Sequence, residues 1–166
     1  MGDAPSAVAV AVPAPSVSDP VYPAFLVLAG RLLTPTQGRG WQASYDPIKR
    51  PELLFFTGRV GQGERSEPAA ARIRAEVAQI LERPALPGEN AKTRETFRLF
   101  LDRSLDPATC AKDARAFAIA RARRTDLRLD TVPIVVESVA KSDLDEAAKL
   151  FDPMRTAAVI AGGAIR

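Results

Sequence analysis

Few side chains in this sequence could carry out chemistry on a substrate. Histidine, the commonest general base and a frequent metal ligand, does not occur among the 166 residues. Cys110 is the one cysteine, which excludes a disulfide within the chain and argues against a structural zinc site. Its alanine-rich surroundings predict a small core residue. The sequence therefore predicts a protein that is not an enzyme, with no catalytic residue, no metal, no cofactor and no small-molecule substrate.

Two motifs resemble chemical sites and have simpler explanations. Residues 58–63, GRVGQG, lack the Gly-Lys-Ser/Thr ending of a phosphate loop and do not match the dinucleotide pattern, so we interpret them as a flexible turn. Three acidic residues, Asp143, Asp145 and Glu146, lie at the expected start of a helix. The helix dipole favours carboxylates there without any catalytic role.

Basic residues gather in one stretch of a chain whose net charge is +3. The run contains Lys112, Arg115, Arg121, Arg123, Arg124 and Arg128. On a helix, Arg121, Arg124 and Arg128 would share one face. Such a face could bind phosphates, and an ordinary solvated helix face is the alternative interpretation.

The composition divides the chain into three segments. Residues 1–23 are rich in Ala, Val, Pro and Ser and predict a disordered N-terminal arm. Residues 24–51 predict a docking and connecting segment, with an apolar patch at 24–33 and with Trp41 and Tyr45 as anchors. Residues 52–166 predict a single globular domain.

Within that domain, one plan occurs twice. A strand over 53–60, a helix over 67–82 and a second helix from Asn90 form a first unit, residues 53–104. A strand over 131–139, a helix capped by Ser142 and a last helix from Met154 towards Arg166 form a second unit, residues 132–166. A helix over 107–124 joins them. The fold class expected is α/β (α+β) and helix-rich.

Two strand-helix-helix units are what a pseudo-dimeric ribbon-helix-helix fold requires. The segments 135–138, 144–148 and 151–154 resemble the C-terminal unit of the single-chain ribbon-helix-helix accessory proteins of T-DNA and plasmid transfer, which bind overdrive DNA. The first unit is similar to that family in layout only. The resemblance implies a DNA-binding accessory protein acting in conjugation-like transfer or in partition. An ordinary α+β domain, with both strands in its core, is the alternative.

The resemblance also implies which residues would contact double-stranded DNA. Thr57, Arg59 and Ser138 would reach the bases or the groove. Lys92, Thr93, Arg155 and Thr156 would hold phosphates, together with the basic face that contains Arg121 and Arg124. Glu137, on the second expected strand, argues against this interpretation because a carboxylate repels phosphate.

The partners expected are double-stranded DNA and a partition-type ATPase or transfer proteins. The alternative function is a structural or assembly subunit of a phage particle or another large complex, which would bind neighbours through its N-terminal arm. No stretch approaches the roughly 20 apolar residues of a membrane helix, so the sequence predicts no membrane partner and a cytoplasmic location.

Overall fold

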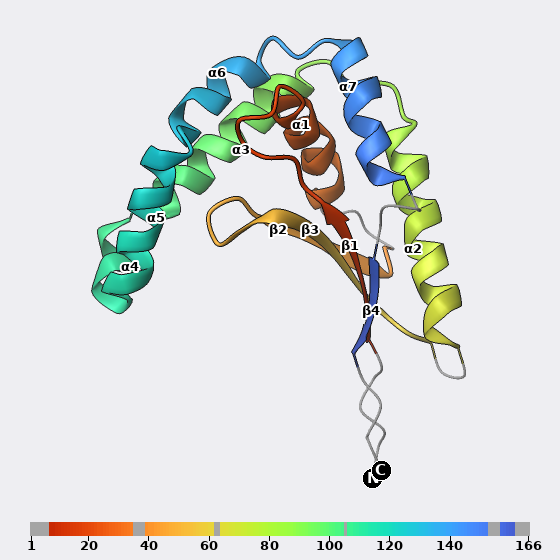
Figure 1. Cartoon of the computed structure of the whole chain (residues 1–166). Helices are drawn as coiled ribbons and strands as arrows, with labels where there is room; N and C mark the ends of the chain where they lie inside the picture. The colour runs from red at the N-terminus through yellow and green to blue at the C-terminus, as the bar shows by residue number, and fades with distance from the viewer. Residues whose placement is uncertain (1–6, 35–38, 62–63, 105, 153–156, 162–166) are drawn as a thin grey trace.

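The computed structural model describes residues 7–34, 39–61, 64–104, 106–152 and 157–161. In these residues four antiparallel strands form one sheet in the order β2-β3-β1-β4. The strands are β1 (Ala7–Pro13), β2 (Trp41–Asp46), β3 (Arg50–Arg59) and β4 (Ala157–Ala161). Helices arch over one side of the sheet, as Figure 1 shows. The fold is α+β and helix-rich.

An alternation of alanine and valine determines which face of β1 meets the helices. Side chains of a strand point alternately to its two faces, and Val8, Val10 and Val12 are each 1% exposed. In the neighbouring β3, Leu54 and Phe56 are buried in the same way. The inner face of the sheet is therefore a continuous apolar surface.

The helix α1 (Tyr22–Leu33) is the centre of the core. Eight of its residues are buried, because it packs against the sheet on one side and against α2, α3, α6 and α7 on others. A helix that is apolar nearly all round is expected in such a position. The Phe25 ring stacks on Phe151 at 5.8 Å and meets the edge of Tyr45 at 5.5 Å.

Two long helices follow β3 in the chain. In α2 (Ser66–Leu81), buried residues recur at helical spacing and face β1 and β3. The next helix is α3 (Glu89–Ser104), and an ion pair joins its first residue to α1. Arg31 donates to both Glu89 oxygens, at 2.6 and 2.8 Å, and also to the carbonyls of Leu81 and Arg83. This contact fixes the turn between α2 and α3 against α1.

The remaining helices are short. They are α4 (Pro107–Lys112), α5 (Ala114–Asp126), α6 (Val132–Val136) and α7 (Lys141–Ala148), with 3₁₀ turns at η1 (Leu129–Thr131) and η2 (Lys149–Phe151). Asp113 caps α5 by accepting from the Ala116 N–H at 2.9 Å. Arg128 ends this segment in the left-handed conformation, at φ 49°. Figure 1 shows α4 and α5 projecting beyond the rest of the helical layer.

Three predicted elements are wrong. Residues 7–13 of the expected arm form β1. The expected strand over 131–139 consists of η1, α6 and a turn, because Pro133 lies in the first turn of a helix and Leu129, Val132 and Val136 are buried at helical spacing. Part of the expected last helix forms β4, which pairs with β1.

Other predictions are confirmed or changed in detail. The strand over 53–60 and the helices over 67–82 and from Asn90 correspond to β3, α2 and α3. The expected connector contains β2, and Trp41 and Tyr45 are anchors in it: Trp41 donates to Glu76 at 2.6 Å, and Tyr45 donates to the Pro51 carbonyl. The helix over 107–124 is divided at Asp113 into α4 and α5.

The ribbon-helix-helix pseudo-dimer is therefore wrong. That fold needs two equivalent strands paired with each other, whereas β3 pairs with β1 and β2 and the second expected strand is helical. Within the described residues, none of the helices has the length and apolar character needed to cross a membrane. The side chain of Cys110 lies outside the described part of the chain.

Candidate functional site

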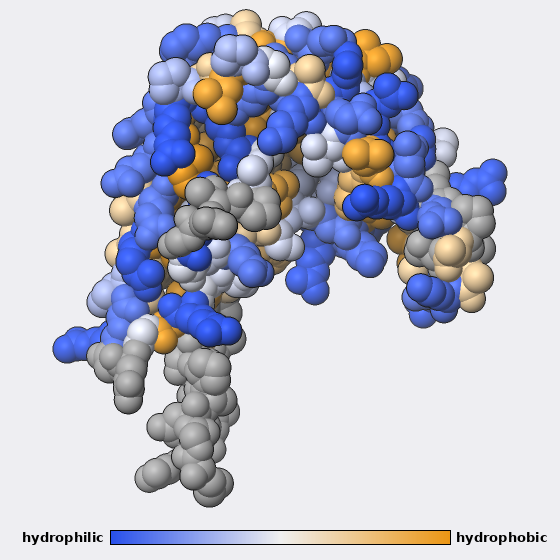
Figure 2. Space-filling view, turned by 180° about the vertical axis from the view of Figure 1, so that it is seen from behind, coloured by the Kyte–Doolittle hydropathy of each residue, from blue (hydrophilic) through white to orange (hydrophobic). Residues whose placement is uncertain are grey.

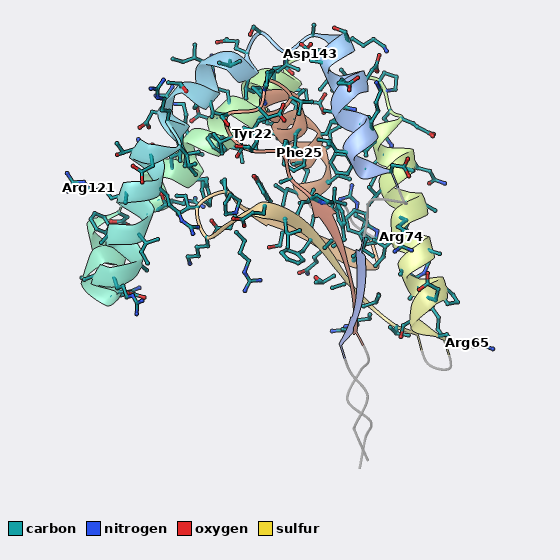
Figure 3. The ribbon with its side chains drawn as sticks, in the orientation of Figure 1. Tyr22, Phe25, Arg65, Arg74, Arg121 and Asp143 are labelled. Carbon is teal, nitrogen blue, oxygen red and sulfur yellow. The ribbon has the colours of Figure 1, made fainter. Side chains whose placement is uncertain are left out.

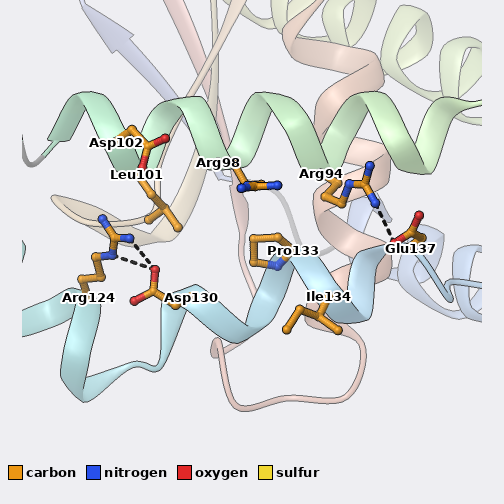
Figure 4. A pocket seen from close by; sticks show the side chains of 9 residues that line it. All are labelled: Arg94, Arg98, Leu101, Asp102, Arg124, Asp130, Pro133, Ile134 and Glu137. Carbon is orange, nitrogen blue, oxygen red and sulfur yellow. Dashed lines mark hydrogen bonds and ion pairs between the residues drawn. The ribbon is translucent and has the colours of Figure 1, made fainter.

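A cleft of about 420 Å³ lies between α3 and the segment that runs from the end of α5 through η1 to α6. Three arginines, three carboxylates and three apolar residues line it (Figure 4): Arg94, Arg98, Arg124, Asp102, Asp130, Glu137, Leu101, Pro133 and Ile134. Charged and apolar groups therefore share one concave surface, which is more highly charged than most ligand sites.

Two ion pairs hold the walls of the cleft together. Arg94 of α3 contacts Glu137, which follows α6, at 2.7 Å. Arg124 of α5 donates to Asp130 of η1 through Nε at 2.8 Å and approaches it through Nη2 at 2.5 Å. The hydrogen bond to Asp130, with the negative charges of Asp130 and Asp102, raises the pKa of the Arg124 guanidinium. Both pairs are partly exposed, so their contribution to stability is modest.

Two donors of the cleft remain unused. Arg98 makes no ion pair or hydrogen bond with the residues that the structure describes, and its side chain is exposed. The Nε of Arg94 is buried and has no hydrogen-bond partner in this part of the chain. An unsatisfied buried donor is costly, and because this atom is buried, Arg98 is the donor that a ligand could reach directly.

The arginines of the cleft can hold an anionic group, and its carboxylates can accept hydrogen bonds or protons. Arginine stays protonated and cannot act as a base. Among the described residues no nucleophile is activated by a histidine, because the sequence contains none. The same residues contain no group of three His, Cys, Asp or Glu side chains that could hold a metal ion.

The outer face of the sheet is a second accessible surface. Ala9, Leu53 and Phe55 point to this side and are half-buried, while Thr57 and Gln42 are exposed. The helical contacts of β1 and β3 are made by α2, on the opposite face. An antiparallel sheet commonly presents one face to water, and this one keeps apolar groups there.

The residues predicted to contact DNA do not form one surface. Thr57 and Arg59 are exposed on β3, whereas Lys92 is exposed on α3 and Thr93 beside it is buried with its hydroxyl towards Gly30. Arg121 points away from α5 (Figure 3). The others are placed as follows: Arg124 pairs with Asp130, Ser138 donates to the Val135 carbonyl, and Arg155 and Thr156 lie outside the described residues.

The sequence reasoning missed Arg94 and Arg98 as members of a site. They are one helical turn apart, and Asp102 follows after another turn. That spacing is a visible signal in the sequence. This spacing does not indicate a site by itself, because the facing side of the cleft is formed by α6 and Glu137, where the sequence predicts a strand.

The face of the molecule opposite to that seen in Figure 1 is mainly hydrophilic. Seen from behind, hydrophobic residues interrupt it only in small separate groups (Figure 2). Exposed large hydrophobic side chains include Leu86, Ile134 and Val135, at 72%, 73% and 48% exposure. Of these three, only Ile134 lines the cleft.

Comparisons with known proteins identify the fold. The chain is similar to the inactive peptidase domain of a "putative zinc protease" from Bordetella parapertussis, with a TM-score of 0.71 and 15% identity over 100% of this chain and 94% of that one. A "putative zinc protease" from Bordetella pertussis Tohama I gives a TM-score of 0.66 at 15% identity, covering 95% of this chain and 94% of that one.

A protease from Helicobacter pylori has the same fold over part of its length. Its TM-score is 0.58 at 11% identity, and the likeness covers 96% of this chain and 41% of that one. No family model and no curated protein matches the sequence. These likenesses, at 11–15% identity, show that the chain shares the fold of these structures.

These likenesses overturn the functional prediction. The neighbours are peptidase-like domains, so a DNA-binding accessory protein of conjugation or plasmid partition is wrong, as are the partners double-stranded DNA and a partition-type ATPase. The resemblance to the ribbon-helix-helix family is wrong for the same reason. The alternative of a phage or assembly subunit has no support in these neighbours either.

Proposed function

We propose that this chain is a non-catalytic domain of the peptidase-like fold that binds polypeptide without cleaving it. The observation that carries the proposal is the likeness, over the whole chain, to a domain described as inactive. Fold likeness alone does not transfer an activity. The side-chain chemistry of this sequence therefore decides between a catalytic and a non-catalytic domain.

That chemistry favours a domain without catalysis. A hydrolytic zinc ion is held by three protein ligands, most often including histidine, and it activates a bound water. This sequence has no histidine and only one cysteine. Carboxylates alone make a poor site for zinc, which prefers nitrogen and sulfur ligands.

The outer face of the sheet is the surface that suits an extended polypeptide. An extended chain can lie across or beside strands, where apolar side chains give it contact area and backbone groups at an edge give it hydrogen bonds. Leu53 and Phe55 supply partly exposed apolar area on β3, and β2 forms one edge of the sheet. Binding of this kind requires no catalytic group.

Two measurements on the purified protein test the two halves of the proposal. Fluorescein-labelled casein is incubated with the protein, once with added Zn²⁺ and once with EDTA. We expect no release of labelled peptides in either condition, and a rise in fluorescence anisotropy that reports binding. Zinc-dependent cleavage would overturn the non-catalytic assignment, and the absence of any binding would overturn the polypeptide-binding role.

A pair of matched variants locates the surface. Phe55→Lys places a charge on the outer face of β3, while Leu99→Lys makes the same kind of change on α3, where Leu99 is 47% exposed. Both are first checked for an unchanged unfolding temperature. Casein binding should weaken in Phe55→Lys alone, and equal weakening in both would contradict the assignment to the sheet face.

A further inference from the structure

We propose that the cleft between α3 and α6 binds the C-terminal carboxylate of a peptide whose last side chain is apolar. The proposal rests on the polypeptide-binding function above and adds to it a second site, in the helical layer rather than on the outer face of the sheet. It starts from an imbalance of charge at one end of the cleft. Arg94 and Arg98 lie one helical turn apart on α3, and only Arg94 has an acidic partner.

Two cations at this spacing repel each other. Glu137 compensates for one of them from the opposite wall, whereas Arg98 makes no ion pair with a described residue and has Asp102 one turn further along α3. A ligand carboxylate next to Arg98 would supply an ion-pair partner at the Arg94 end of the cleft. Guanidinium and carboxylate form short, charge-assisted and often bidentate hydrogen bonds.

The acidic residues of the cleft leave this end free. Asp130 is engaged by Arg124, and Asp102 acts on the same arginine through its charge. In Figure 4, Asp102 and Arg94 lie on opposite sides of Arg98 along α3. A carboxylate is therefore favoured on the Arg94 side of Arg98 and disfavoured on the Asp102 side, which gives the ligand a direction.

The apolar wall indicates what adjoins the carboxylate. Leu101, Pro133 and Ile134 line the cleft, and Ile134 is 73% exposed although it is large and apolar. An apolar side chain of the ligand would cover Ile134. A free anion such as acetate offers no such contact. The volume of about 420 Å³ lies in the range of roughly 300–1,000 Å³ that is usual for ligand sites.

The decisive comparison uses one short peptide in two forms. A fluorescent N-acylated tripeptide ending in leucine is titrated with the intact protein, once with a free C-terminal carboxylate and once as the C-terminal amide. We expect the acid to bind about tenfold more tightly or better, because the amide cannot make the charged hydrogen bonds. Equal affinity for the two forms would overturn the proposal.

Two pairs of variants identify the residues. Arg98→Gln should reduce the affinity for the acid to that for the amide, while Arg121→Gln, which removes the same charge from α5, should leave both affinities unchanged. Glu137→Gln releases Arg94 and should increase the affinity for the acid, whereas the α7 control Glu146→Gln should not. An Arg98→Gln variant that folds and still prefers the acid would also overturn the proposal.

These results are separable from the test of the proposed function. If casein binds but acid and amide tripeptides bind equally, the subsite is wrong and the polypeptide-binding role stands. If neither casein nor either tripeptide binds, the polypeptide-binding role is wrong as well. Acetate is titrated as a third arm: an affinity equal to that of the acid peptide would mean that the cleft recognises an anion only and would overturn the peptide assignment.

Discussion

Replacing Glu89 by glutamine should destabilise the protein strongly, because it leaves a buried guanidinium without its counter-charge. The side chains of Arg31 and Glu89 are 9% and 13% exposed, and two short N–H···O bonds join them. Breaking such a pair from one side costs about 3–5 kcal/mol. Glutamine keeps one acceptor oxygen, and the hydrogen bond that this oxygen still accepts recovers about 1 kcal/mol of that loss. We therefore expect the free energy of unfolding to fall by about 2–4 kcal/mol.

Urea unfolding followed by circular dichroism measures this change. With a denaturant slope of about 2 kcal/mol per molar urea, the midpoint should fall by about 1–2 M. The matched control is Asp145→Asn, which breaks the pair with Lys141. Those side chains are 63% and 85% exposed. An exposed pair of this kind contributes about 0–1 kcal/mol, so the control should remain close to wild type.

A double-mutant cycle tests the reasoning itself. If the cost comes from a stranded charge, Arg31→Met combined with Glu89→Leu should be more stable than the Glu89→Gln variant, although it removes more hydrogen bonds. A loss of less than about 0.5 kcal/mol in Glu89→Gln would contradict the cost of a stranded charge. Additive effects of Arg31→Met and Glu89→Leu would contradict it as well.

Two further substitutions test the packing, and a third tests the pH dependence of stability. Gly58→Ala would bring a Cβ to 3.0 Å from the Ile73 Cδ1 and 3.1 Å from a backbone oxygen, so thermal unfolding should show a loss of about 1–3 kcal/mol, and an unchanged midpoint would contradict it. Phe25→Ala removes a ring that is 0% exposed, and the same measurement should show a loss of about 3–5 kcal/mol, with less than about 1 kcal/mol as the contrary result. Burial raises the pKa of Tyr45 to about 12, so the folded state holds its proton longer than the unfolded chain and stability should fall as the pH rises from about 10 to about 12. Tyr45→Phe should flatten that fall in a series of urea midpoints, and an unchanged slope would contradict the assignment.

The sequence predicts the middle of the fold well because its elements carry their own signals. α2 has a helical apolar stripe, and β3 has a run of large apolar residues closed by proline and glycine. These signals are local, so they remain valid whatever lies around them. The α+β class and the anchoring roles of Trp41 and Tyr45 could be predicted for the same reason.

The predictions for the two ends of the chain were wrong for a physical reason. The Ala-Val segment of β1 and the Ala-rich segment of β4 have too little apolar area to form an element alone. β1 becomes a strand because it lies between β3 and β4, where both of its edges are paired. Its two-residue alternation was present in the sequence, but the prolines and small residues favoured an arm. Pairing partners 40 or more residues away, such as Val8 and Gly58, are not visible to local patterns.

Predicting the candidate site from the sequence requires a decision between a helical and a strand period for residues 132–136. Val132, Ile134, Val135 and Val136 have the β-branched side chains of a strand, yet Val132 and Val136 are buried and Ile134 and Val135 are exposed. That pattern is helical, since residues four apart share a face. Packing against α3 therefore outweighs the preference of β-branched side chains for strands in this segment.

Glu137 connects the failed prediction with the present proposal. As a strand residue it argued against phosphate binding; as the residue after α6 it contacts Arg94 across the cleft. By pairing with Arg94, it leaves Arg98 as the arginine of the cleft that makes no ion pair with a described residue. A phosphate monoester carries more negative charge than one such cation balances, whereas a carboxylate carries one unit. The pairing of Glu137 with Arg94 therefore favours a singly charged ligand over a phosphate monoester, in agreement with the proposed peptide carboxylate.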